Sequence, residues 1–135
     1  MENAPKKNDP KRVVIVDDEE DVVLYLSMIL TDHGYEVQSA NGGREGLALI
    51  KQSKPDLVCL DILMPIETGL SLFKKVRTDP ELADLPVIII SGMDLSEKMG
   101  DDDEGVGAQI RHPEGYLEKP VKPEQLLETV KAVIG

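Results

Sequence analysis

Five polar residues, each at or near the end of a short apolar run, could act together on a phosphoryl group or a metal ion. They are Asp17, Asp18, Asp61, Ser91 and Lys119. Carboxylates that gather at one place raise one another's pKa values unless a cation neutralises them. Mg2+ suits such a place because it binds one or two carboxylates, waters and a phosphate. Lys119 supplies a second, fixed positive charge.

Each of these residues also has a simpler explanation when it is taken alone. Asp18 could cap a helix, with Asp21 completing a capping box. Ser91 could be a small turn residue, and Lys119 could face solvent at the end of a strand. Asp61 is harder to explain in this way, because it stands within DLVCLDILMP after an apolar run, where an unpaired carboxylate is costly.

The elements that must position these residues are short strands and amphipathic helices in alternation. Strands are predicted at 12–16, 35–40, from 57 to near 61, 85–92 and 115–120. Helices are predicted at 20–34, 43–54, 68–79 and 122–135, with Thr68 as the N-cap of the third. This order predicts an α/β domain with a doubly wound five-stranded parallel sheet and helices on both faces. The carboxyl ends of such strands meet at one edge, where ligands bind.

The segment 93–114 breaks the alternation where a fourth crossover helix is expected. Three glycines and the acidic run 101–104 interrupt any helical pattern there. We therefore expect this helix to be irregular, with 96–99 and 106–110 as its helical fragments. A calcium loop is an alternative for the acidic run, but the ligand spacing of an EF-hand is absent.

The composition limits the class of protein and its partners. The 135 residues fit one domain, and the net charge of −11 opposes direct binding to nucleic acid or anionic membranes. We predict a disordered leader over 1–11, a folded domain over 12–135 and a cytoplasmic location, because the N-terminus lacks an apolar signal-peptide core. The single cysteine, Cys59, is expected to behave as a small buried hydrophobe.

Four segments resemble the receiver domain of two-component response regulators, of the chemotaxis-regulator type with a flavodoxin-like fold. They are VVIVDDEED, DLVCLDILMP, VIIISG and GYLEKP. The resemblance implies that Asp61 accepts a phosphoryl group and that Asp17, Asp18, Asp61 and the Leu63 carbonyl hold Mg2+. It also implies that Lys119 and Ser91 contact the phosphoryl oxygens and that the Lys119–Pro120 bond is cis.

The same resemblance implies a switch and its partners. Ser91 would move toward the phosphoryl group and Tyr116 would turn inward, which would change the surface formed by helix four, strand five and helix five. A sensor histidine kinase or a phosphotransfer protein would donate the phosphoryl group to an otherwise non-enzymatic switch. The downstream effector stays unidentified, and a homodimer is compatible with this scheme. The length favours a stand-alone switch, although a receiver from a longer protein fits equally.

Three features depart from the family pattern. The segment between Ser91 and Tyr116 is longer than usual, and Val121 stands where many relatives have phenylalanine. Leu63 and Met93 stand where polar side chains of some relatives orient the attacking water. We therefore expect slow self-dephosphorylation.

Two other functions compete with this interpretation. A phosphatase or phosphotransferase of the haloacid-dehalogenase type would use an aspartate nucleophile after the first strand, with a second aspartate two residues later. Here Glu19 follows Asp17 at that spacing, which disfavours such an enzyme. A receiver-like binding module that is never phosphorylated is the other alternative, and the complete set of five polar residues argues against it.

Overall fold

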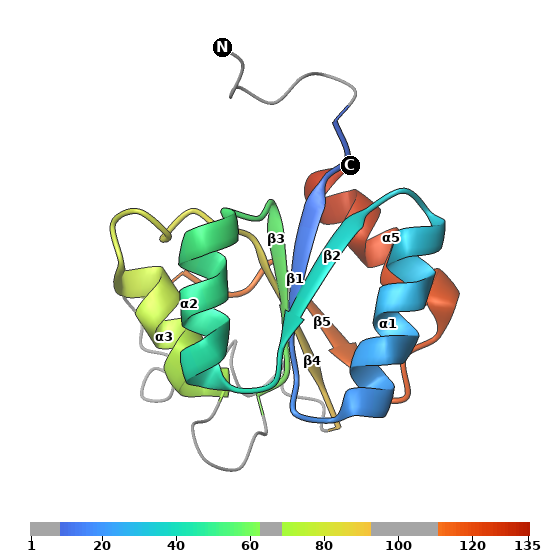
Figure 1. Ribbon diagram of the computed structural model, residues 1–135, viewed down its shortest axis with the longest axis horizontal. Helices are drawn as coiled ribbons and strands as arrows, with labels where there is room; N and C mark the ends of the chain where they lie inside the picture. Colours follow the sequence, from blue (N-terminus) through green and yellow to red (C-terminus); the bar gives the residue numbers. More distant parts are fainter. Residues whose placement is uncertain (1–8, 63–68, 93–110) are drawn as a thin grey trace.

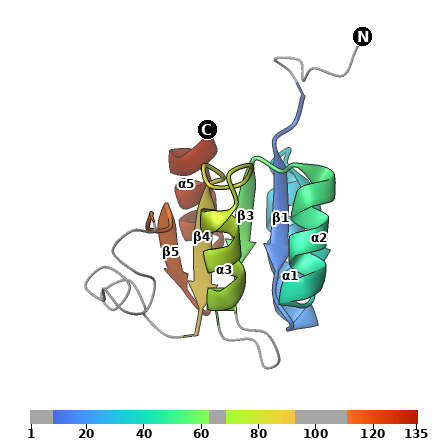
Figure 2. The ribbon, with the colours of Figure 1, turned by 90° about the vertical axis from the view of Figure 1, so that its left-hand side faces the viewer.

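The apolar runs form one parallel sheet in the computed structural model, which describes residues 9–62, 69–92 and 111–135. The strands are β1 (Arg12–Val16), β2 (Glu36–Ala40), β3 (Leu57–Leu60), β4 (Val87–Ser91) and β5 (Gly115–Glu118). Their order is β2-β1-β3-β4-β5, and every neighbouring pair is parallel (Figure 2). This arrangement confirms the predicted α/β fold with a doubly wound five-stranded sheet.

Helices cover both faces of the sheet, as the amphipathic patterns predicted. They are α1 (Glu20–Asp32), α2 (Gly43–Ser53), α3 (Gly69–Thr78) and α5 (Pro123–Ile134). The pair α1 and α5 covers one face, and the pair α2 and α3 covers the other (Figure 1). Gly34 has a positive φ of 92° just after α1, where glycine meets little steric resistance. The predicted cap Thr68 and the two predicted fragments of helix four lie outside the described residues.

Two apolar cores lie on the two faces of the sheet because successive strand residues point to opposite sides. Val14, Val16, Val58 and Leu60 pack with residues of α2 and α3, including Phe73. Their neighbours along β1 and β3 pack with residues of α1 and α5, and Cys59 is one of them. The Cys59 thiol is buried, and burial raises its pKa to about 12. This confirms the prediction that Cys59 behaves as a hydrophobe.

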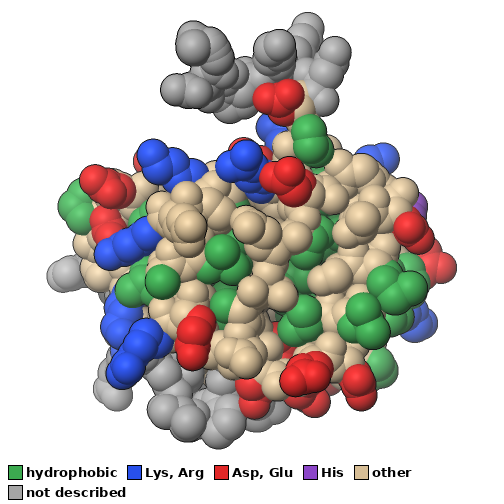
Figure 3. All heavy atoms as spheres, viewed as in Figure 1, with side chains coloured by type: hydrophobic (Ala, Val, Ile, Leu, Met, Phe, Trp, Pro, Cys, Tyr) green, Lys and Arg blue, Asp and Glu red, His purple; other side chains and the backbone are tan. Residues whose placement is uncertain are grey.

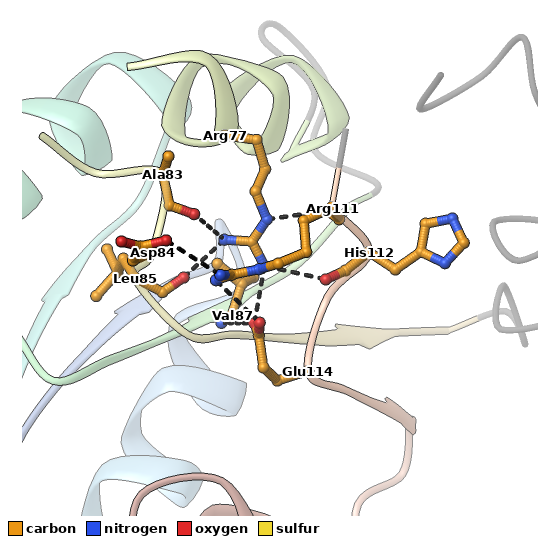
Figure 4. A network of polar contacts seen from close by, with 8 residues as sticks. All are labelled: Arg77, Ala83, Asp84, Leu85, Val87, Arg111, His112 and Glu114. Carbon is orange, nitrogen blue, oxygen red and sulfur yellow. Dashed lines mark hydrogen bonds and ion pairs between the residues drawn. The ribbon is translucent and has the colours of Figure 1, made fainter. Parts of the chain in front are cut away.

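A network around Arg77 fixes the amino-terminal edge of β4 and β5 (Figure 4). The Arg77 side chain, 1% exposed, donates to Glu114 Oε1 at 2.8 Å. It also donates to the carbonyls of Leu85, Arg111 and His112 at 2.7, 2.9 and 3.1 Å. Glu114 Oε1 also accepts from the Val87 N–H at 2.7 Å. One guanidinium therefore joins α3, the loop before β4 and the chain that enters β5.

The surface of the described residues carries few large apolar side chains. Leu24, Tyr25 and Met28 of α1 are exposed, and Figure 3 shows apolar side chains at the surface on this side of the molecule. Acidic side chains gather along the edge at which the strands end (Figure 3). None of the described helices is long and apolar enough to cross a membrane.

Candidate functional site

Two buried carboxylates lie side by side at the carboxyl ends of neighbouring strands. Asp17 follows β1 and is 2% exposed, and Asp61 follows β3 and is 3% exposed. The Asp17 N–H donates to the Ala40 carbonyl at 3.1 Å, and the Asp61 N–H donates to the Val16 carbonyl at 2.9 Å. These bonds continue the pairing of the sheet past the ends of its strands, so the backbone holds both carboxylates at one edge.

Lys119 completes this group from the end of β5. Its Nζ lies 3.0 Å from Asp17 Oδ2 and 3.3 Å from Asp61 Oδ2. Hydrogen bonds to Glu19 and Asp17 outweigh burial of the ammonium and raise the pKa of Lys119, so it stays charged. The structure thus brings together Asp17, Asp61 and Lys119, which the sequence predicted to meet. The Lys119–Pro120 bond is cis, as the resemblance implied.

Glu19 joins the site although it was not among the predicted site residues. Its Oε1 lies 2.6 Å from the Lys119 Nζ, and its side chain is 59% exposed. Oxygen atoms of Asp17, Glu19 and Asp61 all lie within 4.8 Å of one another. The backbone at Glu19 is extended (φ −94°, ψ 108°), and side chains two residues apart on an extended chain point to the same side. In the sequence, the position of Glu19 two residues after Asp17 could have indicated that both acids face the same site.

Asp18 lies elsewhere, exposed and outside the carboxylate group formed by the described residues. The alternative in which Asp18 caps α1 is wrong, because the N-cap is Glu19 and no side-chain bond caps the helix. Instead the Asp17 Oδ1 accepts the Glu19 N–H at 2.9 Å, which orients the buried carboxylate. The role of Asp18 as a metal ligand stays a prediction, and Leu63 lies outside the described residues.

Burial raises the pKa of Asp17, although the Glu19 N–H and Lys119 partly offset the effect. The Coulombic repulsion from Asp61 adds to it. Buried carboxylates that repel each other fit a hard divalent cation with oxygen ligands, because its positive charge would offset the repulsion between Asp17 and Asp61. The donors present therefore fit the predicted Mg2+.

Ser91 and Tyr116 lie next to this site on β4 and β5. Ser91 is 1% exposed at the end of β4, and its carbonyl accepts the Lys119 N–H at 2.7 Å. The ring of Tyr116 packs against the core on the α2–α3 face. Its hydroxyl is buried with no hydrogen-bond partner among the described residues, and burial raises its pKa. Whether the two side chains move on phosphorylation stays a prediction.

Comparison with known proteins identifies the family. The model of the response regulator receiver domain matches residues 13–131. The chain belongs to the response regulator receiver family. Receiver domains are signalling switches that generally are not dedicated enzymes, and their membership of two-component systems implies a histidine kinase or a phosphotransfer protein as partner.

Relatives of this receiver domain include small regulators of similar length. Protein PilH of Pseudomonas aeruginosa is 36% identical over 124 residues, which are 92% of this chain and 98% of that protein. The chemotaxis protein CheY of Thermotoga maritima is 47% identical over 60 residues, 44% of this chain and 50% of that protein. The solved structure of the Vibrio cholerae chemotaxis response regulator CheY4 has a TM-score of 0.79 at 33% identity, covering 92% of this chain and 98% of that one. The chain is thus a receiver domain of the CheY and PilH type.

Proposed function

We propose that this receiver domain is a phosphorylation-dependent switch in which Asp61 accepts a phosphoryl group from a histidine kinase or phosphotransfer protein. An Asp61 oxygen would attack the phosphorus of the phosphohistidine. The new O–P bond would form as the P–N bond breaks, and the imidazole would leave with the electron pair and take up a proton. The position of the Lys119 ammonium, 3.3 Å from Asp61 Oδ2, is the observation that supports this role most directly.

The residues around Asp61 would stabilise charge during this transfer, because phosphoryl transfer depends chiefly on positioning and charge neutralisation. Lys119 would bind phosphoryl oxygens, and the Ser91 hydroxyl would donate a hydrogen bond to one of them. Asp17, Asp18, Asp61 and the Leu63 carbonyl would hold Mg2+. Mg2+ would supply the positive charge that lets a phosphoryl group approach these carboxylates.

The output of the switch would follow from the charge that Asp61 gains. A phosphoryl group adds about −1.5 to −2 charges and three acceptor oxygens, enough to bias two states of a loop. Ser91 would then approach the phosphoryl group and Tyr116 would fill the space that it leaves. The surface of helix four, β5 and α5 would change for an effector that stays unidentified.

The test is to incubate the protein with Mg2+ and phosphoramidate and to locate any acyl phosphate by mass spectrometry. We expect phosphate on Asp61 and none in Asp61→Asn. Phosphate on Asp17 would instead support the aspartate-nucleophile enzyme, and an unmodified wild-type protein would support the binding module. A pull-down with and without beryllofluoride, which mimics the phosphoryl group, then isolates partners that bind only the activated state.

We also propose that the phosphorylated state is long-lived. Leu63 and Met93 cannot orient an attacking water by hydrogen bonds; both lie outside the described residues. Timing the loss of phosphate from purified protein tests this proposal, and a lifetime of seconds would contradict it.

A further inference from the structure

A hydrogen bond joins α1 to the turn that carries Lys119. The Tyr25 hydroxyl donates to the Val121 carbonyl at 2.7 Å, across 96 residues of sequence. Val121 stands two positions after Lys119, between β5 and α5. Because Tyr25 is 43% exposed, apolar burial alone does not account for a tyrosine at this place. Its hydroxyl makes a contact that phenylalanine could not make.

The turn 119–121 has few other tethers among the described residues. On its incoming side, the Lys119 N–H donates to the Ser91 carbonyl at 2.7 Å. On its outgoing side, the Val121 side chain is buried in the core on the α1–α5 face. Within the described residues β5 pairs only with β4, so no second strand supports its far side. The Tyr25 hydroxyl adds a directional hydrogen bond from α1 to the backbone of this turn.

The position of this turn sets where the ammonium lies. Lys119 Nζ is 2.6 to 3.3 Å from carboxylates of Asp17, Glu19 and Asp61, which lie in the segments that follow β1 and β3. A shift of the turn would change all three distances at once. Misplacement of a reacting group by about 1 Å can slow a reaction by roughly 100-fold.

We infer that Tyr25 is a positioning residue for phosphoryl transfer, which holds the turn 119–121 so that the Lys119 ammonium faces Asp61. This inference rests on the proposed function of Asp61. Among the described residues the Tyr25 hydroxyl bonds to the Val121 carbonyl and not to a site residue, so Tyr25 would act through Lys119. The ring of Tyr25 packs on the surface of the domain, and its hydroxyl holds the turn in place through the bond to the Val121 carbonyl.

The test is a double-mutant cycle on the rate of Asp61 phosphorylation by phosphoramidate at saturating Mg2+. Tyr25→Phe keeps the ring, and we expect it to slow phosphorylation about three- to tenfold, the range that the loss of one hydrogen bond allows. In a Lys119→Met background the same change should slow the reaction no further, because Tyr25 acts through the lysine. The matched control is Tyr35→Phe, since Tyr35 packs against the same core after α1 and should leave the rate unchanged.

A second measurement separates this inference from the proposed function. The 15N signal of the Lys119 ammonium should shift in Tyr25→Phe and not in Tyr35→Phe, whether or not the protein is phosphorylated. Equal slowing by Tyr25→Phe in both backgrounds would overturn the inference, as would an unchanged lysine signal. A wild-type protein that carries no phosphate on Asp61 would contradict the proposed function, and the lysine signal would still decide the role of Tyr25.

Discussion

Replacing Arg77 with methionine should cost far more stability than the same change at an arginine on the surface. Arg77→Met keeps an apolar chain beside Phe73, over whose ring the guanidinium carbon lies 4.9 Å from the centroid. It removes the donors to Glu114 and to the backbone carbonyls that surround the buried guanidinium. The carbonyls of Leu85, Arg111 and His112 then lose this donor.

The size of the loss follows from the burial of the guanidinium, which is 1% exposed, whereas its partner Glu114 is 26% exposed. Breaking a buried ion pair by removing one partner costs about 3–5 kcal/mol. Glu114 is partly exposed and keeps a contact of 3.0 Å with Arg111, so we expect at most about 3 kcal/mol, the lower end of that range. At a urea dependence of about 2 kcal/mol per M, the unfolding midpoint should fall by at most about 1.5 M.

The matched control is Arg12→Met. Arg12 Nε lies 2.7 Å from Glu36 Oε1, as close as Arg77 lies to Glu114, but both side chains are about half exposed (54% and 51%). Exposed pairs contribute at most about 1 kcal/mol, so this variant should stay within that loss. Urea unfolding of both variants under one condition is the assay. Equal losses, or a loss below about 1 kcal/mol for Arg77→Met, would refute the reasoning from burial.

Three more predictions concern the site and its supports. Burial raises the pKa of Asp17 above 3.8, so the native state retains a proton that the unfolded state releases. That contribution is present below pH 3.8 and is lost as pH rises through the native pKa. Without metal, the stability of Asp17→Asn relative to wild type should therefore increase as pH is raised from 3.5 to 7 in urea titrations, and a variant less stable at pH 7 would contradict this. Because the thiol of Cys59 is buried and its pKa is about 12, Ellman's reagent at pH 8 should react only after urea unfolds the chain, and rapid labelling of native protein would speak against it. A Cβ at Gly69 would lie 1.9 Å from the Asp61 carbonyl oxygen, whereas one at Gly92 meets none of the described residues within 4 Å. Gly69→Ala should therefore lower the melting temperature and Gly92→Ala should not. Similar melting temperatures would contradict this prediction, because the backbone would then have moved to relieve the clash with the Asp61 carbonyl.

Local pattern was enough to predict the sheet and most of its site. Apolar runs such as 12–16 mark buried strands, and parallel strands have their carboxyl ends at one edge. The meeting of Asp17, Asp61 and Lys119 follows from these two facts without any knowledge of side-chain geometry. The cis bond after Lys119 came from the family resemblance instead, since no physical pattern in the chain indicates it.

The remaining features depend on contacts between distant segments. Arg77 follows Val76 on α3 and looks in the sequence like a solvent-facing arginine; its partners are Glu114 and loop carbonyls that only the tertiary fold brings close. Tyr25 likewise lies on a helix face whose neighbour, Val121, is 96 residues away. Glu19 was missed for a different reason, because two aspartates before it already accounted for the expected metal site.

The acidic half of the site, Asp17 and Asp61, follows strands that are paired on both sides, whereas the basic half, Lys119, follows a strand with one paired neighbour among the described residues. The doubly paired strands are β1 and β3, and the strand before Lys119 is β5. In native-state hydrogen exchange, amides of doubly paired buried strands open with global unfolding, and edge segments open earlier. The acidic half should therefore persist for as long as the domain is folded. The basic half should open earlier through local fluctuations, and the exchange lifetime of the β5 amides would report how often the strand that carries Lys119 opens.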